Sequence, residues 1–233
     1  MPETYASESY RRRVAQIPHS VAARLQQAIG DGSLAVGAKL PSQRQLSDQF
    51  GVSRASLREA VSMLATLGLV DIRPGLGVFV TDPAGRAPLW RFSHAASARD
   101  VYEARLALEG TAAALAAGRI SDLALGQVAR LVDDIACGLE LSDLVAMSVA
   151  DAAFHDSIVE IAGNPLIGSM YRSARELMME SQRAPMATRE RLAETVAEHR
   201  IILEALQRRD PGLASAAMQR HIRRSALRLG IPL

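Results

Sequence analysis

The sequence contains very little cysteine, lysine or aromatic residue, and it has no long apolar run. Cys137 is the only cysteine in 233 residues, so no disulfide can form within the chain and nothing indicates an oxidising compartment. Its apolar neighbours predict a partly buried, unreactive thiol. No apolar run approaches the roughly 20 residues of a transmembrane helix. The polar first 16 residues include three consecutive arginines but lack the apolar segment of a signal peptide. These absences predict a soluble, cytoplasmic protein with no membrane partner.

Lysine is almost absent, since Lys39 is the only one and the other 26 of the 27 basic residues are arginines. The net charge of +2 is too small to indicate a nucleic-acid partner by itself. Residues 1–82 hold 9 basic and 7 acidic side chains, whereas the remainder holds 18 of each. The positive surplus therefore lies in the N-terminal third, where motifs must decide its meaning.

Three short helices are predicted in the N-terminal third. An apolar stripe at helical spacing indicates a helix over residues 20–30. Ser42 and Gln45 have the spacing of a capping box, which starts a second helix that ends at Gly51. Ser53 can cap a third helix. The inward positions of this third helix are Leu57, Val61 and Leu64. Two short helices joined by a tight glycine-containing turn are typical of a helix-turn-helix.

The outward face of the third helix is predicted to carry Arg54, Ala55, Arg58 and Ser62. Arg54 and Arg58 are four residues apart, so both project from one side near the helix N-terminus, where a recognition helix meets base edges. The small residues Ala55 and Ser56 would let this end enter a major groove closely. Considered alone, two arginines on an exposed helix face more often form an ordinary solvated surface.

A hairpin is predicted after the third helix. Val70, Ile72, Val78 and Val80 alternate around the turn sequence PGLG at 74–77. Three helices followed by a hairpin make a winged helix-turn-helix. This context favours a DNA-reading function for the arginines over a merely solvated face.

The segment LPSQRQLSDQFGVSRASLREAVSMLATLGLVDIRPGLGVFV resembles the DNA-binding domain of the GntR family of bacterial transcription regulators. The resemblance implies that the arginines touch an operator through guanine edges or phosphates, together with the helix start and the glycine wing tip. The residues so assigned are Arg44, Ser53, Arg54, Ser56, Arg58, Gly75 and Gly77. Gln43 departs from the acidic residue common in relatives. Leu76 stands where relatives often have a polar or basic side chain, and it cannot hydrogen-bond to DNA.

The C-terminal two thirds are predicted to be entirely helical. We divide the chain into a flexible N-terminus (1–16), a DNA-binding domain (17–82), a linker (83–97) rich in Pro, Gly, Ala and Ser, and a helical domain (98–233). Periodicity predicts helices at about 98–118, 121–138, 141–162, 165–182, 187–208 and 210–229, with no strand. The fold class is therefore mainly α: a winged helix-turn-helix with a short β-hairpin, followed by an antiparallel bundle of six or seven helices.

Four polar residues of this domain fall on apolar helix stripes. Asp151 and His155 lie one turn apart on the stripe of Phe154, and His199 and His221 face inward from two further helices. One buried histidine is usually a hydrogen-bonded core residue, but three with a carboxylate would each need a separate partner in an apolar bundle. One divalent metal satisfies all four. The ligand types favour zinc, with nickel or another first-row metal possible, over calcium or magnesium.

The segments YEARLALEGTAAALAA, DAAFH, AGNP and EHRIILEALQRRDPGLASAAMQRHI resemble the effector domain of the FadR subfamily within GntR. The resemblance implies a metal held by Asp151, His155, His199 and His221, with a small organic acid bound against it. Arg105 faces inward on its own stripe, where it can bind the carboxylate of that effector or pair with an acid such as Glu109.

Together these features predict a transcription regulator, in particular a repressor, that responds to a small carboxylate and reads a pseudo-palindromic operator as a homodimer. An enzyme is not expected, because an enzyme needs a general acid or base beside its metal. The stripe neighbours of the ligands do not titrate; they are Phe154, Ile158, Ile202 and Met218. A direct metal sensor remains an alternative, although histidine and carboxylate ligands discriminate poorly between first-row metals.

Overall fold

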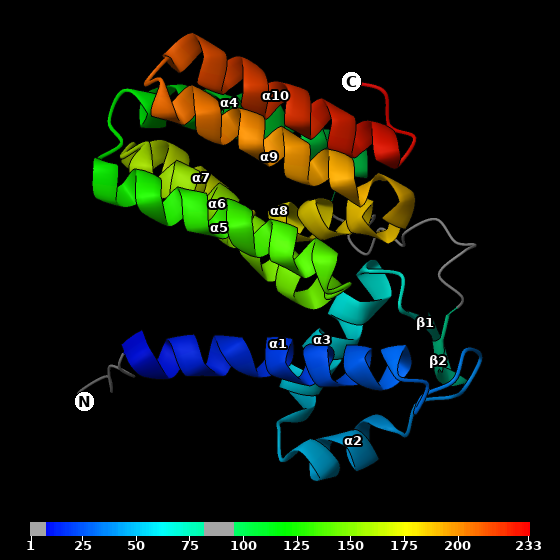
Figure 1. Cartoon of the computed structure of the whole chain (residues 1–233). Helices are drawn as coiled ribbons and strands as arrows, with labels where there is room; N and C mark the ends of the chain where they lie inside the picture. Colours follow the sequence, from blue (N-terminus) through cyan, green and yellow to red (C-terminus); the bar gives the residue numbers. More distant parts are fainter. Residues whose placement is uncertain (1–7, 82–95) are drawn as a thin grey trace. The chain divides into compact units, whose positions relative to one another are not determined.

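The structure is a computed structural model that describes residues 8–81 and 96–233. The chain divides into two compact units, Met1–Arg86 and Ala87–Leu233, and each is considered separately (Figure 1). Residues 83–95 of the predicted linker (83–97) lie outside the described residues, as do residue 82 and residues 1–7. Within the described ranges, no helix combines the length and the hydropathy of a transmembrane span.

The N-terminal unit is built from three helices followed by a hairpin. The elements are α1 (Glu8–Gly30), α2 (Gln43–Phe50), α3 (Arg54–Thr66), β1 (Val70–Arg73) and β2 (Gly77–Val80). Both α1 and α2 pack against α3. Helix α1 starts well before the predicted residue 20 and runs through Pro18, so it includes residues 8–16, which we had assigned to a flexible N-terminus. This order of elements is the predicted winged helix-turn-helix.

The two helices of the helix-turn-helix begin at side-chain caps. Ser42 Oγ accepts a hydrogen bond from the Gln45 backbone N–H at 3.3 Å, and Gln45 Oε1 accepts one from the Ser42 backbone N–H at 2.9 Å. Gly51 ends α2 in the left-handed conformation, with φ of 65°. Ser53 Oγ then accepts from the Ser56 N–H at 3.1 Å and caps α3. Such caps each contribute about 1 kcal/mol, and here they fix the point at which the recognition helix starts.

Only the first part of α3 is accessible to a partner. Every residue from 60 to 67 is buried, and both α1 and β1 contact this helix. The prediction that Ser62 faces outward is therefore wrong, since Ser62 is 5% exposed. Arg54, Ala55 and Arg58 are exposed as predicted.

Beside the predicted two-stranded hairpin, the wing contains a short additional stretch of β-pairing. Val70 pairs with Val80 and Ile72 with Val78 in the predicted antiparallel register. In addition, Lys39 forms a bridge with Phe79 on the other side of β2. The Leu40 N–H donates to the Val78 carbonyl at 2.8 Å, and the Val80 N–H donates to the Ala38 carbonyl at 2.9 Å. The loop before α2 thus forms a short third edge of the wing.

The C-terminal unit contains seven α-helices in the part of the chain that the structure describes. They are α4 (Ala98–Ala117), α5 (Asp122–Glu140), α6 (Leu144–Ile161), α7 (Pro165–Ser173), α8 (Arg175–Arg183), α9 (Leu192–Gln207) and α10 (Pro211–Arg228). Two 3₁₀ helices, Ala184–Ala187 and Arg189–Arg191, connect α8 to α9. The helix expected at 165–182 is two helices that meet at Ala174, where φ is −106° and ψ is 16°. The helix expected from residue 187 starts at Leu192.

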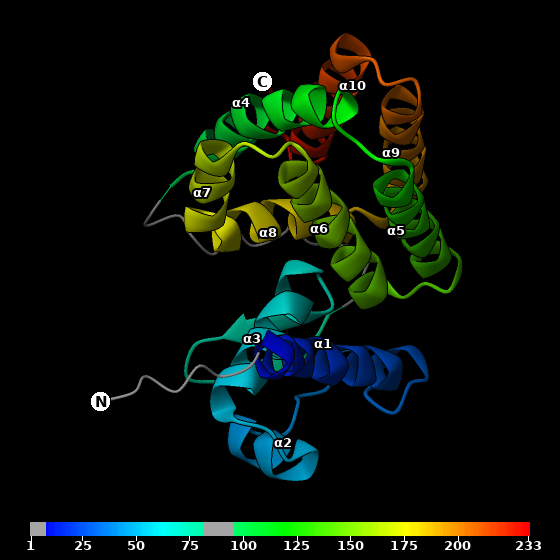
Figure 2. The same cartoon turned by 90° about the vertical axis from the view of Figure 1, so that its left-hand side faces the viewer.

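Helices α4, α9 and α10 pack against one another, and α5 packs against α6 and α9 (Figure 2). The α5–α6 contact is close, because a Cβ at Gly138 would lie 2.8 Å from the Met147 backbone nitrogen. Cys137, next to this contact, is exposed, so the prediction of a partly buried thiol is wrong. Helix α6 contacts α4 as well as α5, which places its inward face at the centre of the unit.

Candidate metal centre and nucleic-acid interface

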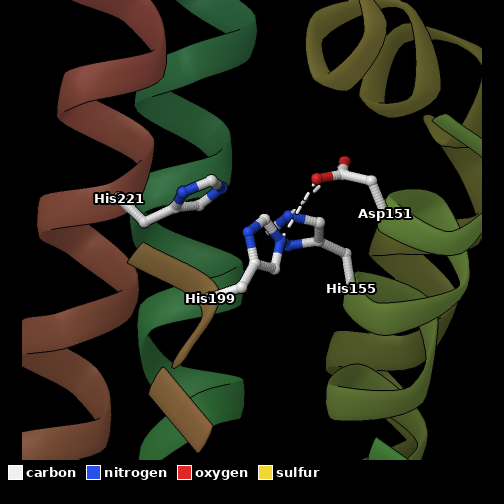
Figure 3. Close-up of side chains that lie close together, drawn as sticks. All are labelled: Asp151, His155, His199 and His221. Carbon is white, nitrogen blue, oxygen red and sulfur yellow. Dashed lines mark ion pairs between the residues drawn. The ribbon is translucent and has the colours of Figure 1, made fainter. Parts of the chain in front are cut away.

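The four predicted metal ligands lie together inside the C-terminal unit (Figure 3). Asp151 and His155 come from α6, His199 from α9 and His221 from α10, and one ligand atom of each lies within 4.8 Å of the others. None is more than 3% exposed. His199 Nε2 lies 3.1 Å from Asp151 Oδ1, and His155 Nε2 lies 3.9 Å from Asp151 Oδ2. Three helices thus deliver their polar side chains to one point in an apolar core.

Apolar stripes aim these side chains inward. On α6, Phe154 and Ile158 are both 0% exposed, and they flank His155 on the buried face. Ile202 and Leu206 on α9 are also 0% exposed, and so is Ile222 on α10. Burial of each stripe brings the polar residues on it into the core, because residues three or four apart share a helix face.

Each of the three histidines has an oxygen atom close to its Nδ1 atom, and at His199 and His221 the two atoms are aligned as a hydrogen bond, whereas at His155 the contact is a short ion pair. His155 Nδ1 lies 2.6 Å from Glu109 Oε2, and His221 Nδ1 lies 2.9 Å from Glu198 Oε2. The backbone carbonyl of Thr195 accepts from His199 Nδ1 at 2.8 Å. Contacts of this kind fix the tautomer and the ring orientation of metal-binding histidines. The Nε2 lone pair of each ring then remains available.

Three ligand atoms of the cluster are buried without an aligned hydrogen bond: Asp151 Oδ2, His155 Nε2 and His199 Nε2. Buried polar atoms without a partner are rare, because each has lost its hydration without replacement. A divalent cation accepts electron pairs from all of these atoms at once. Three imidazoles and one carboxylate are a donor set that zinc and other first-row ions prefer. The residues present therefore fit a metal.

The electrostatics of the cluster favour the protonation states that a metal requires. Burial disfavours the imidazolium form of His221 and lowers its pKa to about 3. Burial by itself would raise the pKa of Asp151, but its close contact with His199 and the other neighbouring histidines outweigh burial and lower that pKa to about 2. Near neutral pH the cluster thus contains an ionised carboxylate and, at His221, a neutral imidazole, as metal binding needs.

Arg105, the predicted effector residue, is fully buried and paired. Its Nε lies 2.7 Å from Glu109 Oε1, and its Nη1 donates to Ser181 Oγ at 3.4 Å. Although burial would raise the pKa of Glu109, Arg105 and His155 together hold it well below the usual range. Of the two roles considered for Arg105, the ion pair with Glu109 is present in the structure. The effector role is a separate prediction.

A small cavity adjoins the cluster. Its volume is about 10 Å³, the space of one water molecule. Its lining includes Arg105, Asp151, Gln182, Met186, Thr195 and His221. Gln182 is 5% exposed, and its Oε1 has no hydrogen-bond partner. The cavity therefore joins the cluster to polar groups of α4 and α8 but is nearly closed.

The predicted DNA-contacting residues lie on the surface of the N-terminal unit. Arg44, Arg54 and Arg58 are exposed, and none forms an ion pair with another described residue. Gly75 and Gly77 have φ of 72° and 121°, which only glycine adopts easily, and they shape the wing tip. The hydroxyl groups of Ser53 and Ser56 lie 3.0 Å apart and belong to the N-terminal cap of α3.

Two residues of the metal centre were missed at the sequence level. Glu198 and the Thr195 carbonyl hold His221 and His199, but we had identified only the four ligands. A signal was present: Glu198 lies three residues after Thr195 and four before Ile202, on one buried face. An acidic residue on an apolar helix stripe indicates a buried polar partner, as the three histidines do.

A capped helix with unpaired arginines beside a wing, together with a separate bundle that encloses a His/Asp cluster, defines a DNA-binding regulator with its own ligand domain. Residues 19–80 match the family described as bacterial regulatory proteins, gntR family, and residues 100–224 match the FCD domain. The chain belongs to the GntR family and carries an FCD domain. It is a transcription regulator and not an enzyme.

Similar proteins agree with this assignment. The chain is 34% identical over 207 residues to the HTH-type transcriptional regulator YcbG of Bacillus subtilis, covering 86% of this chain and 84% of that one. It is 28% identical over 220 residues to the HTH-type transcriptional repressor NanR of Cronobacter sakazakii, covering 89% and 83%. Among solved structures, E. coli McbR/YncC shares the fold with a TM-score of 0.54 at 18% identity, over 93% of this chain and 94% of that one.

Proposed function

We propose that this regulator is a cytoplasmic repressor whose affinity for operator DNA is controlled by a small organic acid that binds beside a divalent metal in the FCD domain. The observation that carries the proposal is the buried cluster of Asp151, His155, His199 and His221, with three ligand atoms lacking an aligned hydrogen bond. The similarity to NanR, a transcriptional repressor, supports repression as the sign of the regulation.

Operator recognition is assigned to the exposed start of α3 and to the wing. Arg54 and Arg58 read guanine edges in the major groove or clamp phosphates, and Arg44 contacts the DNA from α2. Their lack of ion-pair partners among the described residues supports this role, because a partnered arginine would have to give up its acid. A homodimer presents two such units to half-sites about one helical turn apart.

The metal is assigned to the four-residue cluster, with zinc as the preferred ion and nickel or another first-row metal as alternatives. When bound, it supplies a Lewis-acidic positive charge to which a carboxylate can attach. The chain's own contribution is orientation: Glu109, Glu198 and the Thr195 carbonyl hold the three rings with their Nε2 atoms free.

The cavity beside the cluster is the assigned effector site. The cavity is too small for this ligand as it stands, because a space for one water molecule does not hold an organic acid. Binding therefore requires the cavity wall to move. Part of the wall is Met186, in the 3₁₀ segment between α8 and α9, where α-helical hydrogen bonding is interrupted. To bind the effector carboxylate, Arg105 has to form an ion pair with that carboxylate while it keeps its ion pair with Glu109.

The small cavity also favours a second candidate function. A direct metal sensor needs no space for an organic ligand, and the nearly closed cavity satisfies that condition. In this alternative the ion itself is the effector.

Operator affinity measured under three conditions separates the candidates. Full-length protein would be stripped with a chelator, reloaded with zinc, and then mixed with a panel of small mono-, di- and hydroxycarboxylic acids, with binding to a selected operator measured each time. We expect an acid to shift the affinity only when zinc is present. A full response to zinc alone supports the metal sensor. If no condition changes operator affinity, both candidates are wrong.

A further inference from the structure

The wing has no cationic side chain at its tip. Leu76, at the turn, is 62% exposed and apolar. Arg73, on β1, is already engaged: its Nε lies 2.9 Å from Asp71 Oδ2, and its guanidinium carbon lies 4.4 Å from the centre of the Phe79 ring. A wing that touches DNA through this tip alone would offer only backbone and apolar contacts to a strongly anionic partner.

Lys39, the only lysine of the chain, lies beside this wing. Its backbone pairs with Phe79 on the free side of β2. Its side chain covers Gly77, because a Cβ built at that glycine would lie 2.6 Å from Lys39 Cε and 3.4 Å from Nζ. The stem therefore occupies the space that a side chain at position 77 would fill. Lys39 is nevertheless exposed, and its ammonium forms no ion pair within the described residues.

The surroundings of Lys39 are suited to an anion. Lys39 and Arg73 line a surface groove of about 610 Å³ between the start of α2 and the wing. Ser42, Gln43 and Gln45 form the α2 side of the groove. All thirteen residues that line it are neutral or cationic, so nothing in the lining repels a phosphate. Arg44 is the neighbour of two lining residues and belongs to the predicted DNA surface.

We infer that Lys39 is the DNA-contacting cation of the wing and that it binds a backbone phosphate of the operator. A lysine is a compact charge on a flexible stem, whereas bidentate reading of a base edge suits arginine. Lys39 therefore adds affinity without adding sequence preference. A side chain at position 77 would displace the lysine stem, in addition to straining the backbone at a φ of 121°. This inference rests on the proposed operator contacts of α3.

The test uses full-length Lys39→Met, which keeps much of the stem and removes the charge, and Lys39→Arg, which restores the charge. We expect Lys39→Met to weaken binding to operator and unrelated DNA by the same factor and to reduce the slope of log K against log salt by about 1. Lys39→Arg should restore the slope. Arg130→Gln, which removes an exposed charge from α5, controls for net charge. All variants should unfold at the wild-type temperature.

Because Lys39 is the only lysine, amine acylation read by mass spectrometry gives a second measurement. The operator should protect Lys39 from the reagent, and an unrelated duplex at higher salt should not. An unchanged salt slope in Lys39→Met, or full labelling of Lys39 in the operator complex, overturns the inference while the α3 contacts stand. If wild-type protein binds no DNA sequence selectively, the proposed function fails first and this inference fails with it.

Discussion

Two buried carboxylates connect the histidines of the metal centre to arginines. Glu109 contacts His155 with one oxygen and Arg105 with the other, at 2.6 and 2.7 Å. Glu198 does the same for His221 and Arg228, at 2.9 and 2.6 Å. An arginine beside a carboxylate favours its ionised form, which is the better acceptor for an imidazole N–H. The ring orientation at the centre thus depends on residues that never touch the metal.

The first prediction concerns Glu198→Gln. The amide keeps the volume but loses the negative charge that holds the His221 ring, so zinc affinity should fall about 10- to 100-fold. Competition with a chromophoric chelator measures it. Glu204→Gln, at an exposed position of the same helix, is the matched control and should leave the affinity unchanged. Equal zinc affinity in both variants would mean that packing alone orients His221.

The second prediction concerns His199→Ala. This change removes one ligand and leaves a cavity between Phe154 and His221, whose rings lie 4.6 Å from the His199 ring. Metal content by elemental analysis should drop, and zinc should no longer raise the unfolding temperature as it does in the wild type. DNA binding by the N-terminal unit should persist in the folded variant. Full metal occupancy in His199→Ala would show that the four-ligand assignment is wrong.

The grouping of Asp151, His155, His199 and His221 could be predicted because each is a polar residue on an otherwise apolar stripe, a pattern that helical periodicity reveals. The contact between Glu198 and His221 could not be predicted, because it depends on which faces of α9 and α10 pack against each other. The same limit applies to Arg105: its inward direction follows from its stripe, whereas the choice between Glu109 and a ligand depends on three-dimensional contacts. Ser62 shows the converse error, since tertiary packing covered a face that a single helix would expose.

Among the elements of the N-terminal unit, α3 presents only a short accessible face. Every residue from 60 to its end is buried, so only the turns that carry Arg54 and Arg58 remain accessible. We expect a recognition helix with so short an accessible face to read few base pairs, so that each arginine contributes a large share of the specificity.

The third prediction is therefore that Arg58→Ala abolishes selective operator binding. Loss of a bidentate guanine contact costs on the order of 1–3 kcal/mol of discrimination, measurable by competition between operator and mutated duplexes. Metal content should not change, because Arg58 lies in the other unit. Arg44→Ala serves as a comparison and should weaken all duplexes more evenly if Arg44 contacts phosphate. An undiminished preference for the operator in Arg58→Ala would remove α3 from base reading.

The boundaries of α7, α8 and α9 could not be predicted well. Residues 165–182 have helical propensity throughout, and nothing in the sequence marks Ala174 as the point where the axis changes. Pro185 does explain why α8 ends, since proline lacks the N–H that a continuing helix would need. The 3₁₀ segment that follows contributes Pro185 and Met186 to the cavity wall, so the irregular element forms part of that wall.

The fourth prediction follows from that closure. Met186 is 2% exposed, and its truncation in Met186→Ala should enlarge the cavity at a cost of about 2–5 kcal/mol in the free energy of unfolding. Zinc-loaded Met186→Ala should bind acetate or larger acids more tightly than zinc-loaded wild type, as measured by calorimetry. Met170→Ala, at a half-exposed position of α7, should change neither property. Weaker acid binding in Met186→Ala would place the effector elsewhere.

At the scale of the whole molecule, regulation requires coupling between two separately packed units. A ligand in the FCD domain changes operator affinity only if it binds the DNA-competent and DNA-incompetent arrangements with different affinity. A ligand with equal affinity for both stabilises the protein without regulating it. In the proposed function, zinc and the organic acid can therefore have different roles even though both are assigned to one site.

The fifth prediction separates these roles. If the ion is structural, zinc should raise the unfolding temperature of the FCD domain but shift the operator dissociation constant by less than about twofold. The acid, added to zinc-loaded protein, should shift it by roughly 5- to 150-fold, the usual range of allosteric coupling. Linkage requires operator DNA to change the acid's dissociation constant by the same factor, which provides an internal check. His199→Ala should lose the acid response and the zinc stabilisation together. A large shift on zinc alone would instead assign the regulatory signal to the metal.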